Sequence, residues 1–327
     1  MCAVELSYCV VNTDGRRFVI ACLEAIRATA PDGVDYEVLL VDNASADGSA
    51  DAVAAWNAGP NGLGERLRLI RGERRRGKAE LDGSLLAAAG GTFCVLLNED
   101  SELRPGAVTA LLEALRSRPD AAVAGATLLD PNGNPQPSAW RLPGVATSLA
   151  SAAFAHRPLV VQSRGAKVRE VGWVQSAAML VRRTAALEVG GFDPDFFVYS
   201  DETDFQKRLH DAGWKVLFVP DARAVHHEQL ATDPNAGARR VAEFHRGRDR
   251  YMRKHHAAAT ATATRWLSAW AYGARAAAAR VLPGHDPAWY RLHVRAALHP
   301  ERGEGLREAA EDYNRRLDAG DDAGART

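Results

Sequence analysis

Short apolar runs alternate with amphipathic stretches along the first part of the chain. Mostly apolar runs at Val4–Val11, Tyr36–Val41, Arg66–Ile70 and Phe93–Leu97 predict strands. The last of these has the unbroken apolar character of a strand buried on both faces. Between the runs, apolar residues recur at the spacing of an amphipathic helix. Strands that alternate with helices in this way predict right-handed βαβ units, and therefore an α/β fold with a mostly parallel sheet flanked by helices.

Several side chains are expected to mark the starts of helices. Asp14 and Ser45 are predicted to cap the helices after the first and second strands, and Asp201 to cap a helix that runs to Ala212. Pro105 is predicted to open another helix, since proline suits a first helical position.

The pattern changes in the second half of the chain. Further strands are predicted at Ala121–Leu129, Val171–Arg182, Trp214–Val219 and Arg223–His226. Residues 136–170 show little periodicity and are expected to be irregular, which in a compact domain is often a sign of function. Beyond about residue 233 the pattern is helical, so we predict an α/β domain over 1–232 and a helical region over 233–327, with the last ten or so residues disordered.

Residues 264–282 form an amphipathic helix when wound at 3.6 residues per turn. Trp266, Trp270 and Val281 fall on one face, and Arg265 and Arg275 on the other. This pattern suits a helix on an anionic membrane surface, and equally a helix packed on the domain or on a second subunit of a homodimer. Because the chain has no net charge, packing is the preferred interpretation.

Composition narrows the class of protein. The 327 residues are 46% hydrophobic, which is ordinary for a globular protein. The 41 Lys and Arg residues balance 41 Asp and Glu residues, so no overall electrostatic field favours a nucleic-acid partner. The four cysteines lack metal-ligand spacing and are predicted to be small buried thiols in a reducing compartment. No signal peptide and no run long enough to span a membrane is recognisable, so a cytoplasmic location is expected.

Acidic residues follow two of the predicted strands. Asp42 ends the second strand, and Asn98, Glu99 and Asp100 follow the fourth. Because ligands of open α/β sheets bind at the carboxyl ends of the strands, these residues are placed to hold a nucleotide and a divalent cation. A solvated turn with a helix-capping acid explains the 98–100 cluster about as well on the residues alone.

A basic loop, Arg71–Lys78, follows the third strand. Arg74 and Arg75 are predicted to be solvated, the common fate of a charge run. Arg76 and Lys78 are left open between solvation and contact with the nucleotide.

A third acidic group begins a later helix. Glu202 is predicted to lie in the first turn, where the helix dipole favours an ionised carboxylate, as a general base requires. Asp204 and Arg208 have the i, i+4 spacing of a structural ion pair. His226 ends a strand and becomes a candidate metal ligand only if a carboxylate site exists nearby. From spacing alone, an acid-rich helix start without function is the simpler explanation of 201–204.

Taken in order over about residues 5–255, the motifs resemble those of family 2 glycosyltransferases with the GT-A fold, a Rossmann-like architecture, close to the rhamnosyltransferase-like branch. The motifs that carry the resemblance are Val41–Ser45 with Asp47–Ser49, Leu96–Asp100, Pro105-Gly106, Gly172–Leu180, Gly190–Asp193, Asp201–Leu209, Ala212–Trp214 and Val219–His226.

The resemblance implies inverting transfer of a sugar from a nucleotide-diphospho-sugar (a dTDP- or UDP-sugar), assisted by Mn²⁺ or Mg²⁺. By motif position, Asp100 and His226 are the expected metal ligands, and one of the pair Asp201 and Glu202 is the base, with Glu202 preferred. The expected donor-binding residues are Asn12, Asp42, Arg76, Lys78, Asn98, Glu99 and Trp173.

Two departures from the family pattern affect the interpretation. The first acid of the DxD-type motif is the amide Asn98, and the acidic pair reads Asp-Glu rather than the more usual Glu-Asp. They keep open a catalytically inactive sugar-nucleotide-binding or scaffold protein. A sugar-nucleotide nucleotidyltransferase ranks lower, because residues 12–17 make a poor triphosphate loop. The expected acceptor is a glycan, a lipid-linked sugar or a small molecule.

Overall fold

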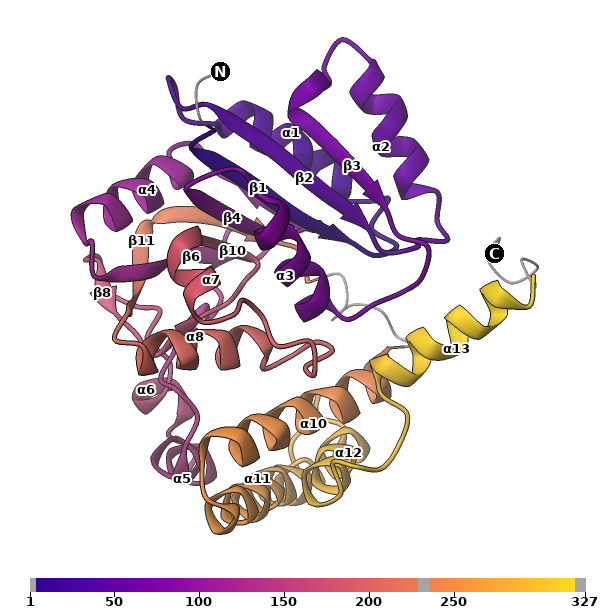
Figure 1. Ribbon diagram of the computed structural model, residues 1–327. Helices are drawn as coiled ribbons and strands as arrows, with labels where there is room; N and C mark the ends of the chain where they lie inside the picture. Colours follow the sequence, from indigo (N-terminus) through magenta and orange to yellow (C-terminus); the bar gives the residue numbers. More distant parts are fainter. Residues whose placement is uncertain (1–3, 229–235, 321–327) are drawn as a thin grey trace.

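A computed structural model describes residues 4–228 and 236–320 (Figure 1). Within these residues the main sheet has nine strands, in the order β3-β2-β1-β4-β10-β6-β11-β5, with β8 paired to β11. The strands are β1 (Leu6–Asn12), β2 (Tyr36–Asp42), β3 (Leu67–Arg71), β4 (Phe93–Asn98), β5 (Ser101–Leu103), β6 (Ala121–Leu129), β8 (Arg169–Glu170), β10 (Ala178–Arg182) and β11 (Lys215–His226). Strands β3, β2, β1 and β4 are parallel, as are β6 and β11, whereas β10 is antiparallel to both of its neighbours.

Helices cover both faces of this sheet (Figure 1). One apolar core joins the sheet to α1, α2 and α4, and a second joins it to α3, α7, α8 and α10. The helices and one 3₁₀ turn are α1 (Val19–Thr29), α2 (Ser49–Ala58), η1 (Gly64–Arg66), α3 (Lys78–Ala88), α4 (Ala107–Ser117), α5 (Val145–Ala152), α6 (His156–Leu159), α7 (Arg183–Glu188), α8 (Asp201–Asp211), α10 (Gly237–His255), α11 (Ala258–Ala278), α12 (Pro287–Leu298) and α13 (Leu306–Asp318).

The unbroken apolar run of β4 is explained by this two-sided burial. Val95 and Leu97 contribute to the first core, and Cys94 and Leu96 to the second, so successive side chains of one strand enter opposite cores. Cys9, Cys22 and Cys94 are buried free thiols, as predicted, whereas Cys2 lies outside the described residues.

Two strand predictions need correction. Residues 171–182 do not form one strand: β9 (Trp173–Val174) pairs with β7 (Ala139–Trp140) in a small second sheet, and β10 begins only at Ala178. The break arises because the buried Gln206 side chain binds both the N–H and the C=O of Val174. The two strands predicted at 214–219 and 223–226 are one strand, β11, with an irregularity between Val219 and Arg223.

The 136–170 segment is more ordered than its pattern predicts, since it contains β7, α5 and α6. The predicted caps Asp14 and Ser45 are also wrong, because α1 begins at Val19 and α2 at Ser49. Both residues instead brace the loops after β1 and β2: Asp14 accepts a hydrogen bond from the N–H of Ala46, and its own N–H donates to Ser45.

The C-terminal helices pack against the second face of the α/β domain (Figure 1). Asp204 on α8 is completely buried and contacts Arg208 at 2.9 Å, as predicted, together with His255 at 2.7 Å and Lys254 at 2.8 Å on α10. This buried group fixes α10 to α8. The predicted domain boundary at 232 and most of the predicted disordered end lie outside the described residues.

Helix α11 packs on the protein, which was the preferred interpretation of its pattern. The face that packs is not the one that carries Trp266 and Trp270. Its contacts are with α5, α10 and α12, through small residues such as Ala261, Ser268 and Ala271. Trp266 and Trp270 remain 64% and 66% exposed. Among the described residues, no helix is long and apolar enough to cross a membrane.

Candidate active site

A cavity of about 510 Å³ opens at the carboxyl ends of β1, β4 and β11, which is the expected edge of the sheet. The first turn of α8 and residues of α10 and α13 complete its wall. Its lining residues are Val11, Thr13, Asp14, Asn43, Arg75, Arg76, Lys78, Asn98, Glu99, Asp100, Gln175, Ser176, Phe197, Val198, Tyr199, Asp201, Glu202, His226, Glu228, Ala236, Arg239, Arg240, Leu306, Ala309 and Ala310. Its volume is that of a small-molecule site.

The acidic cluster after β4 meets His226 at the base of this cavity. Strand β5 pairs with β11 so that Ser101 lies opposite His226, which brings Asp100 beside the imidazole. His226 Nε2 lies 3.5 Å from Asp100 Oδ1 and 3.3 Å from Asn98 Nδ2. Asp100 and His226 are 4% and 5% exposed. The two expected metal ligands are therefore neighbours, although they come from distant parts of the sequence.

The donor set of this pair is consistent with a divalent cation. A carboxylate oxygen and an imidazole nitrogen suit Mn²⁺, and burial lowers the pKa of His226, so its neutral, ligating form is favoured. Nδ1 of His226 is buried and has no hydrogen-bond partner among the described residues. Those residues contain no cluster of three or more His, Cys, Asp or Glu side chains able to hold a metal. Asp100 and His226 are therefore a pair of candidate ligands.

Glu99 lies between these two residues and the loop after β1. Burial, followed by the charge of Asp100, raises the pKa of Glu99 to about 8. Its carboxylate accepts a hydrogen bond from the N–H of Thr13 at 3.3 Å. It therefore couples the 98–100 loop to the loop after β1.

The acidic pair at the start of α8 lies in the same cavity. Tyr199 and Ser200 have positive φ angles of 66° and 63°, and this left-handed turn directs Asp201 and Glu202 inward. The predicted cap is wrong by one position, since α8 begins at Asp201 and the preceding residue is Ser200. Burial, then the charge and hydrogen bond of Asp201, raise the pKa of Glu202 well above its ordinary value. These effects outweigh the helix dipole, which was expected to favour the ionised form.

Lys78 supplies a positive charge close to this pair. Its Nζ contacts the fully buried Asp82 at 2.5 Å and Ser176 at 3.3 Å. Burial by itself lowers the pKa of Lys78, but Asp82 and Asp201 raise it, so the ammonium form persists. The Coulomb interaction with Lys78 in turn opposes the rise in the pKa of Glu202.

Asp42 and Asn12 are not among the residues that line the cavity, and their expected contact with the donor stays a prediction. Asn12 Nδ2 donates to Asp42 at 2.7 Å, and Asp42 also accepts from the N–H of Ser45 at 3.0 Å. The side chains of Asn12 and Asp42 are 0% and 3% exposed, so they connect the loops after β1 and β2 inside the protein. Asp14 and Asn43 line the cavity in their place.

The prediction that Arg75 is solvated is wrong, because its side chain has partners within the protein. It forms an ion pair with Asp14, and its guanidinium lies 3.7 Å above the ring of Tyr313 on α13. Asn314 binds the backbone of Arg75 twice, at 2.7 Å to its N–H and 2.9 Å to its C=O. Arg74 is more exposed and pairs with Asp318. Arg76 lines the cavity, with its backbone bound to Asn43.

The turn after β9 reaches the cavity through Gln175 and Ser176, whereas Trp173 does not line it. Trp173 stacks on Trp140, with ring centroids 4.3 Å apart, so it supports the turn without lining the cavity. Sequence reasoning also missed Tyr199, Arg239 and Arg240, of which Arg240 donates to the hydroxyl of Tyr199 at 3.0 Å.

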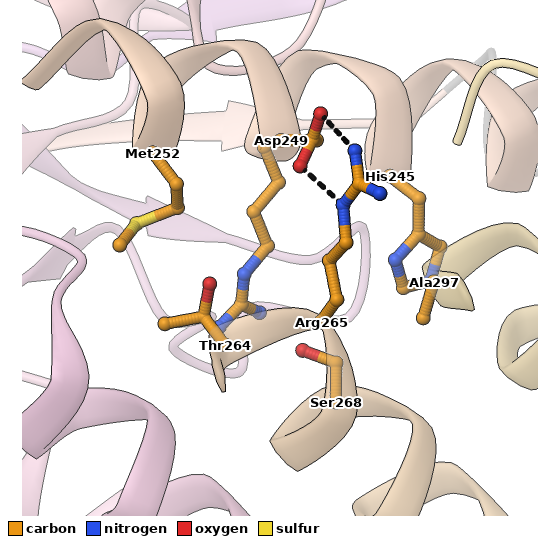
Figure 2. A pocket seen from close by; sticks show the side chains of 8 residues that line it. His245, Asp249, Met252, Thr264, Arg265, Ser268 and Ala297 are labelled. Atoms are coloured by element: carbon orange, nitrogen blue, oxygen red, sulfur yellow. Dashed lines mark hydrogen bonds and ion pairs between the residues drawn. The ribbon is translucent and has the colours of Figure 1, made fainter. Parts of the chain in front are cut away.

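A second, much smaller cavity of about 10 Å³ lies between α10, α11 and α12 (Figure 2). Its wall includes the double hydrogen bond between Arg265 and Asp249, at 2.6 and 2.7 Å. A space of this size holds at most about one water molecule. Of these two cavities, the one of about 510 Å³ is the one large enough for a small-molecule substrate.

Comparison with known proteins identifies the family. The chain matches Glycosyl transferase family 2 over residues 8–163 and Glycosyl transferase family group 2 over residues 93–298. The chain belongs to glycosyltransferase family 2. It is 31% identical over 244 residues to the N-acetylglucosaminyl-diphospho-decaprenol L-rhamnosyltransferase of Mycobacterium tuberculosis, covering 70% of this chain and 78% of that one. It is also 26% identical over 210 residues to the O-antigen biosynthesis protein RfbC of Myxococcus xanthus, covering 62% of this chain and 16% of that one.

Solved structures confirm the GT-A fold of this glycosyltransferase. The mannosyltransferase PcManGT of Pyrobaculum calidifontis, solved with GDP-Man and Mn²⁺, has a TM-score of 0.58 at 19% identity, covering 95% of this chain and 83% of that one. GalNAc-T7, solved with UDP, GalNAc and Mn²⁺, has a TM-score of 0.61 at 15% identity, covering 97% of this chain and 58% of that one. The resemblance seen in the sequence motifs is thus confirmed for family and fold.

Proposed function

We propose that this glycosyltransferase moves a sugar, with inversion, from a nucleotide-diphospho-sugar to a hydroxyl of a sugar carried on a polyprenyl diphosphate. The observation that carries the proposal is the convergence of Asp100, His226, Lys78 and Glu202 on one cavity. The donor is proposed to be a dTDP- or UDP-sugar, with an L-rhamnosyl group as the first candidate. The relative named for L-rhamnosyl transfer to a decaprenol-linked N-acetylglucosamine supports this choice.

In the proposed reaction, Asp100 and His226 are the residues that would hold a divalent cation. When bound, Mn²⁺ or Mg²⁺ supplies positive charge that offsets the charge of the departing nucleoside diphosphate. Two structural neighbours were solved with Mn²⁺. This supports the proposal that the present chain uses the same kind of metal. Arg75 and Arg76 also line the cavity and are proposed to bind the nucleotide end of the donor.

Glu202 acts on the acceptor. It takes the proton of the acceptor hydroxyl while the oxygen attacks the anomeric carbon, and the bond to the diphosphate oxygen breaks with its electron pair. The charge of Lys78, beside Ser176, lowers the pKa of Glu202 and so favours its carboxylate form. Asp201 positions Glu202 through their shared hydrogen bond.

The test is a transfer assay with a panel of dTDP- and UDP-sugars, Mn²⁺ and a short-chain polyprenyl-diphosphate N-acetylglucosamine, read by mass spectrometry. A disaccharide product formed by the wild type and not by Glu202→Gln supports the proposal. The proposal is contradicted if donors of the panel bind but none of them is transferred or hydrolysed. That result would favour an inactive binding protein. Release of inorganic diphosphate from a nucleoside triphosphate and a sugar phosphate would indicate a nucleotidyltransferase.

A further inference from the structure

Two neighbouring helices that do not line the large cavity expose large apolar side chains. Trp266 and Trp270, one helical turn apart on α11, are 64% and 66% exposed. The α5 region exposes the other apolar members, which are Val145 (41%), Leu149 (52%), Phe154 (57%) and Leu159 (56%). These six residues are called the α5/α11 face. Contiguous exposed apolar surface of this kind marks an interaction site more often than an inert surface.

The six residues belong to one surface because α5 and α11 run beside each other, at the lower edge of the view in Figure 1. Near the start of both helices, His256 Nε2 lies 3.0 Å from the carbonyl oxygen of Pro143. Near the end of both, the Arg275 guanidinium lies 4.8 Å from the Phe154 ring. Trp266 and Trp270 lie between these two contacts along α11.

The two segments that form this face carry charge of a single sign. Residues 131–169 contain five Lys or Arg and no Asp or Glu, and residues 258–285 contain three Arg and no Asp or Glu, although the whole chain has equal numbers of both signs. Arg141, Arg157 and Arg164 are exposed around α6: Arg141 donates to the carbonyl of Leu159, and Arg164 to that of Arg157. Arg265 is neutralised by Asp249, so the positive charge is concentrated beside α5 and α6.

We propose that the α5/α11 face docks the enzyme on an anionic lipid bilayer. Tryptophan and leucine side chains beside arginines are the combination that enters the boundary between headgroups and acyl chains, while the cations bind anionic headgroups. A second copy of the chain is a poorer occupant, because a two-fold interface would place two acid-free, positively charged surfaces against each other. The proposal concerns a surface outside the cavity and does not depend on the donor or acceptor assigned above.

The experiment is co-sedimentation of the full chain with vesicles of phosphatidylcholine alone or mixed with phosphatidylglycerol. The wild type is expected to bind the anionic vesicles, and to bind less as salt rises from about 0.1 M to about 0.5 M. The double variant Trp266→Ser, Trp270→Ser should lose about tenfold or more of this binding. Leu187→Ser, which changes an exposed apolar residue on α7, is the matched control and should bind like the wild type.

Charge is tested separately with Arg157→Glu, Arg164→Glu, for which Arg68→Glu on the exposed part of β3 is the control. Thermal unfolding confirms that each variant is folded, and donor hydrolysis reports whether the cavity is intact in the tryptophan variant. The proposal is overturned if the wild type does not bind anionic vesicles, or if the tryptophan double variant binds them as well as the wild type does. A wild-type dimer that becomes monomeric in the double variant, measured by light scattering, overturns it in favour of an interface between copies.

Discussion

His226 Nε2 lies 3.5 Å from Asp100 Oδ1, although one residue ends β11 and the other follows β4. The antiparallel pairing of β5 with β11 produces this contact, because it places Ser101 directly opposite His226. A two-residue strand shift would move every side chain of β5 relative to the imidazole. The pairing of a short strand therefore positions the candidate metal ligands.

The first prediction concerns these ligands. Asp100→Ala should weaken binding of the nucleotide-sugar in the presence of Mn²⁺ by about tenfold or more, which corresponds to about 1.4 kcal/mol. Affinity without Mn²⁺ should change little, because the lost interaction acts through the cation. Calorimetry with Mn²⁺ and with EDTA measures both values, and Asp51→Asn on the exposed surface of α2 is the control. Equal affinities of Asp100→Ala and wild type in Mn²⁺ would remove Asp100 from the site.

The second prediction is the effect of removing the base. Glu202→Gln keeps the size of the side chain but cannot accept a proton, so it should bind donor normally and lose about 10²-fold or more of kcat. Asp201→Asn should reduce kcat less, since Asp201 acts through Glu202. Steady-state transfer kinetics and calorimetry separate the two effects. If Glu202→Gln turned over near the wild-type rate, another residue would have to be the base.

The third prediction is the pH dependence of the reaction. A base works in its deprotonated form, and burial with the Asp201 charge raises the pKa of Glu202, so kcat/KM should fall on acidification at a pH above the ordinary range of a glutamate. Asp201→Asn removes the neighbouring charge, lowers the pKa of Glu202, and should move this acid limb to lower pH. Profiles of kcat/KM at saturating Mn²⁺ measure the shift, with Glu24→Gln on α1 as control. An acid limb that moves upward in Asp201→Asn would contradict this assignment.

The parallel strands were predictable because their apolar runs are required by burial on both faces. Asp100 and His226 could be paired from the sequence only through the family resemblance, because their motif positions make both of them expected metal ligands. The hydrogen bond between Asp42 and Asn12 could not be predicted, because it depends on side-chain packing that spacing does not record. The two-residue strand β9 was missed because Gln206, on another element, determines where it ends.

The role of α13 was the least predictable part of the site. Nothing in the sequence around Arg75 indicates that Tyr313 will lie 3.7 Å below its guanidinium, since that contact depends on how the last helix packs. The exposure of Trp266 and Trp270 was missed for the same reason. Amphipathic periodicity shows that a helix has two faces, but small residues such as Ala261 and Ser268 allowed the less apolar face to pack closely.

The fourth prediction tests the contribution of α13. Tyr313→Ala removes the ring below Arg75, so the guanidinium is held less rigidly beside the cavity and the Kd for nucleotide should rise about fivefold, which corresponds to about 1 kcal/mol. The free energy of unfolding should fall by about 1 kcal/mol, because a partly buried cation–π contact is lost while the bonds from Asn314 to the Arg75 backbone remain. Calorimetry with the nucleoside diphosphate measures the change, and Tyr290→Ala on α12 is the control. Unchanged affinity would limit α13 to a structural role.

The fifth prediction uses a glycine of α10 that touches the turn before the acidic pair. A Cβ at Gly247 would lie 2.5 Å from the carbonyl oxygen of Tyr199, next to the left-handed residues 199 and 200. Alanine normally stabilises a helix interior by about 1 kcal/mol relative to glycine. At this position the backbone of Tyr199 must move, so Gly247→Ala should instead lower the free energy of unfolding by about 1–3 kcal/mol.

The matched control is Gly273→Ala on α11, where an added Cβ meets no atom within 4 Å. It should leave the free energy of unfolding unchanged or raise it by up to about 1 kcal/mol. Urea denaturation of both variants measures this difference, and kcat of Gly247→Ala at a temperature where it is folded reports the displacement of Glu202. Because Tyr199 and Ser200 lead directly into Asp201, kcat should fall more than donor affinity does. Equal stabilities and rates for the two variants would show that the turn adapts without moving the acidic pair.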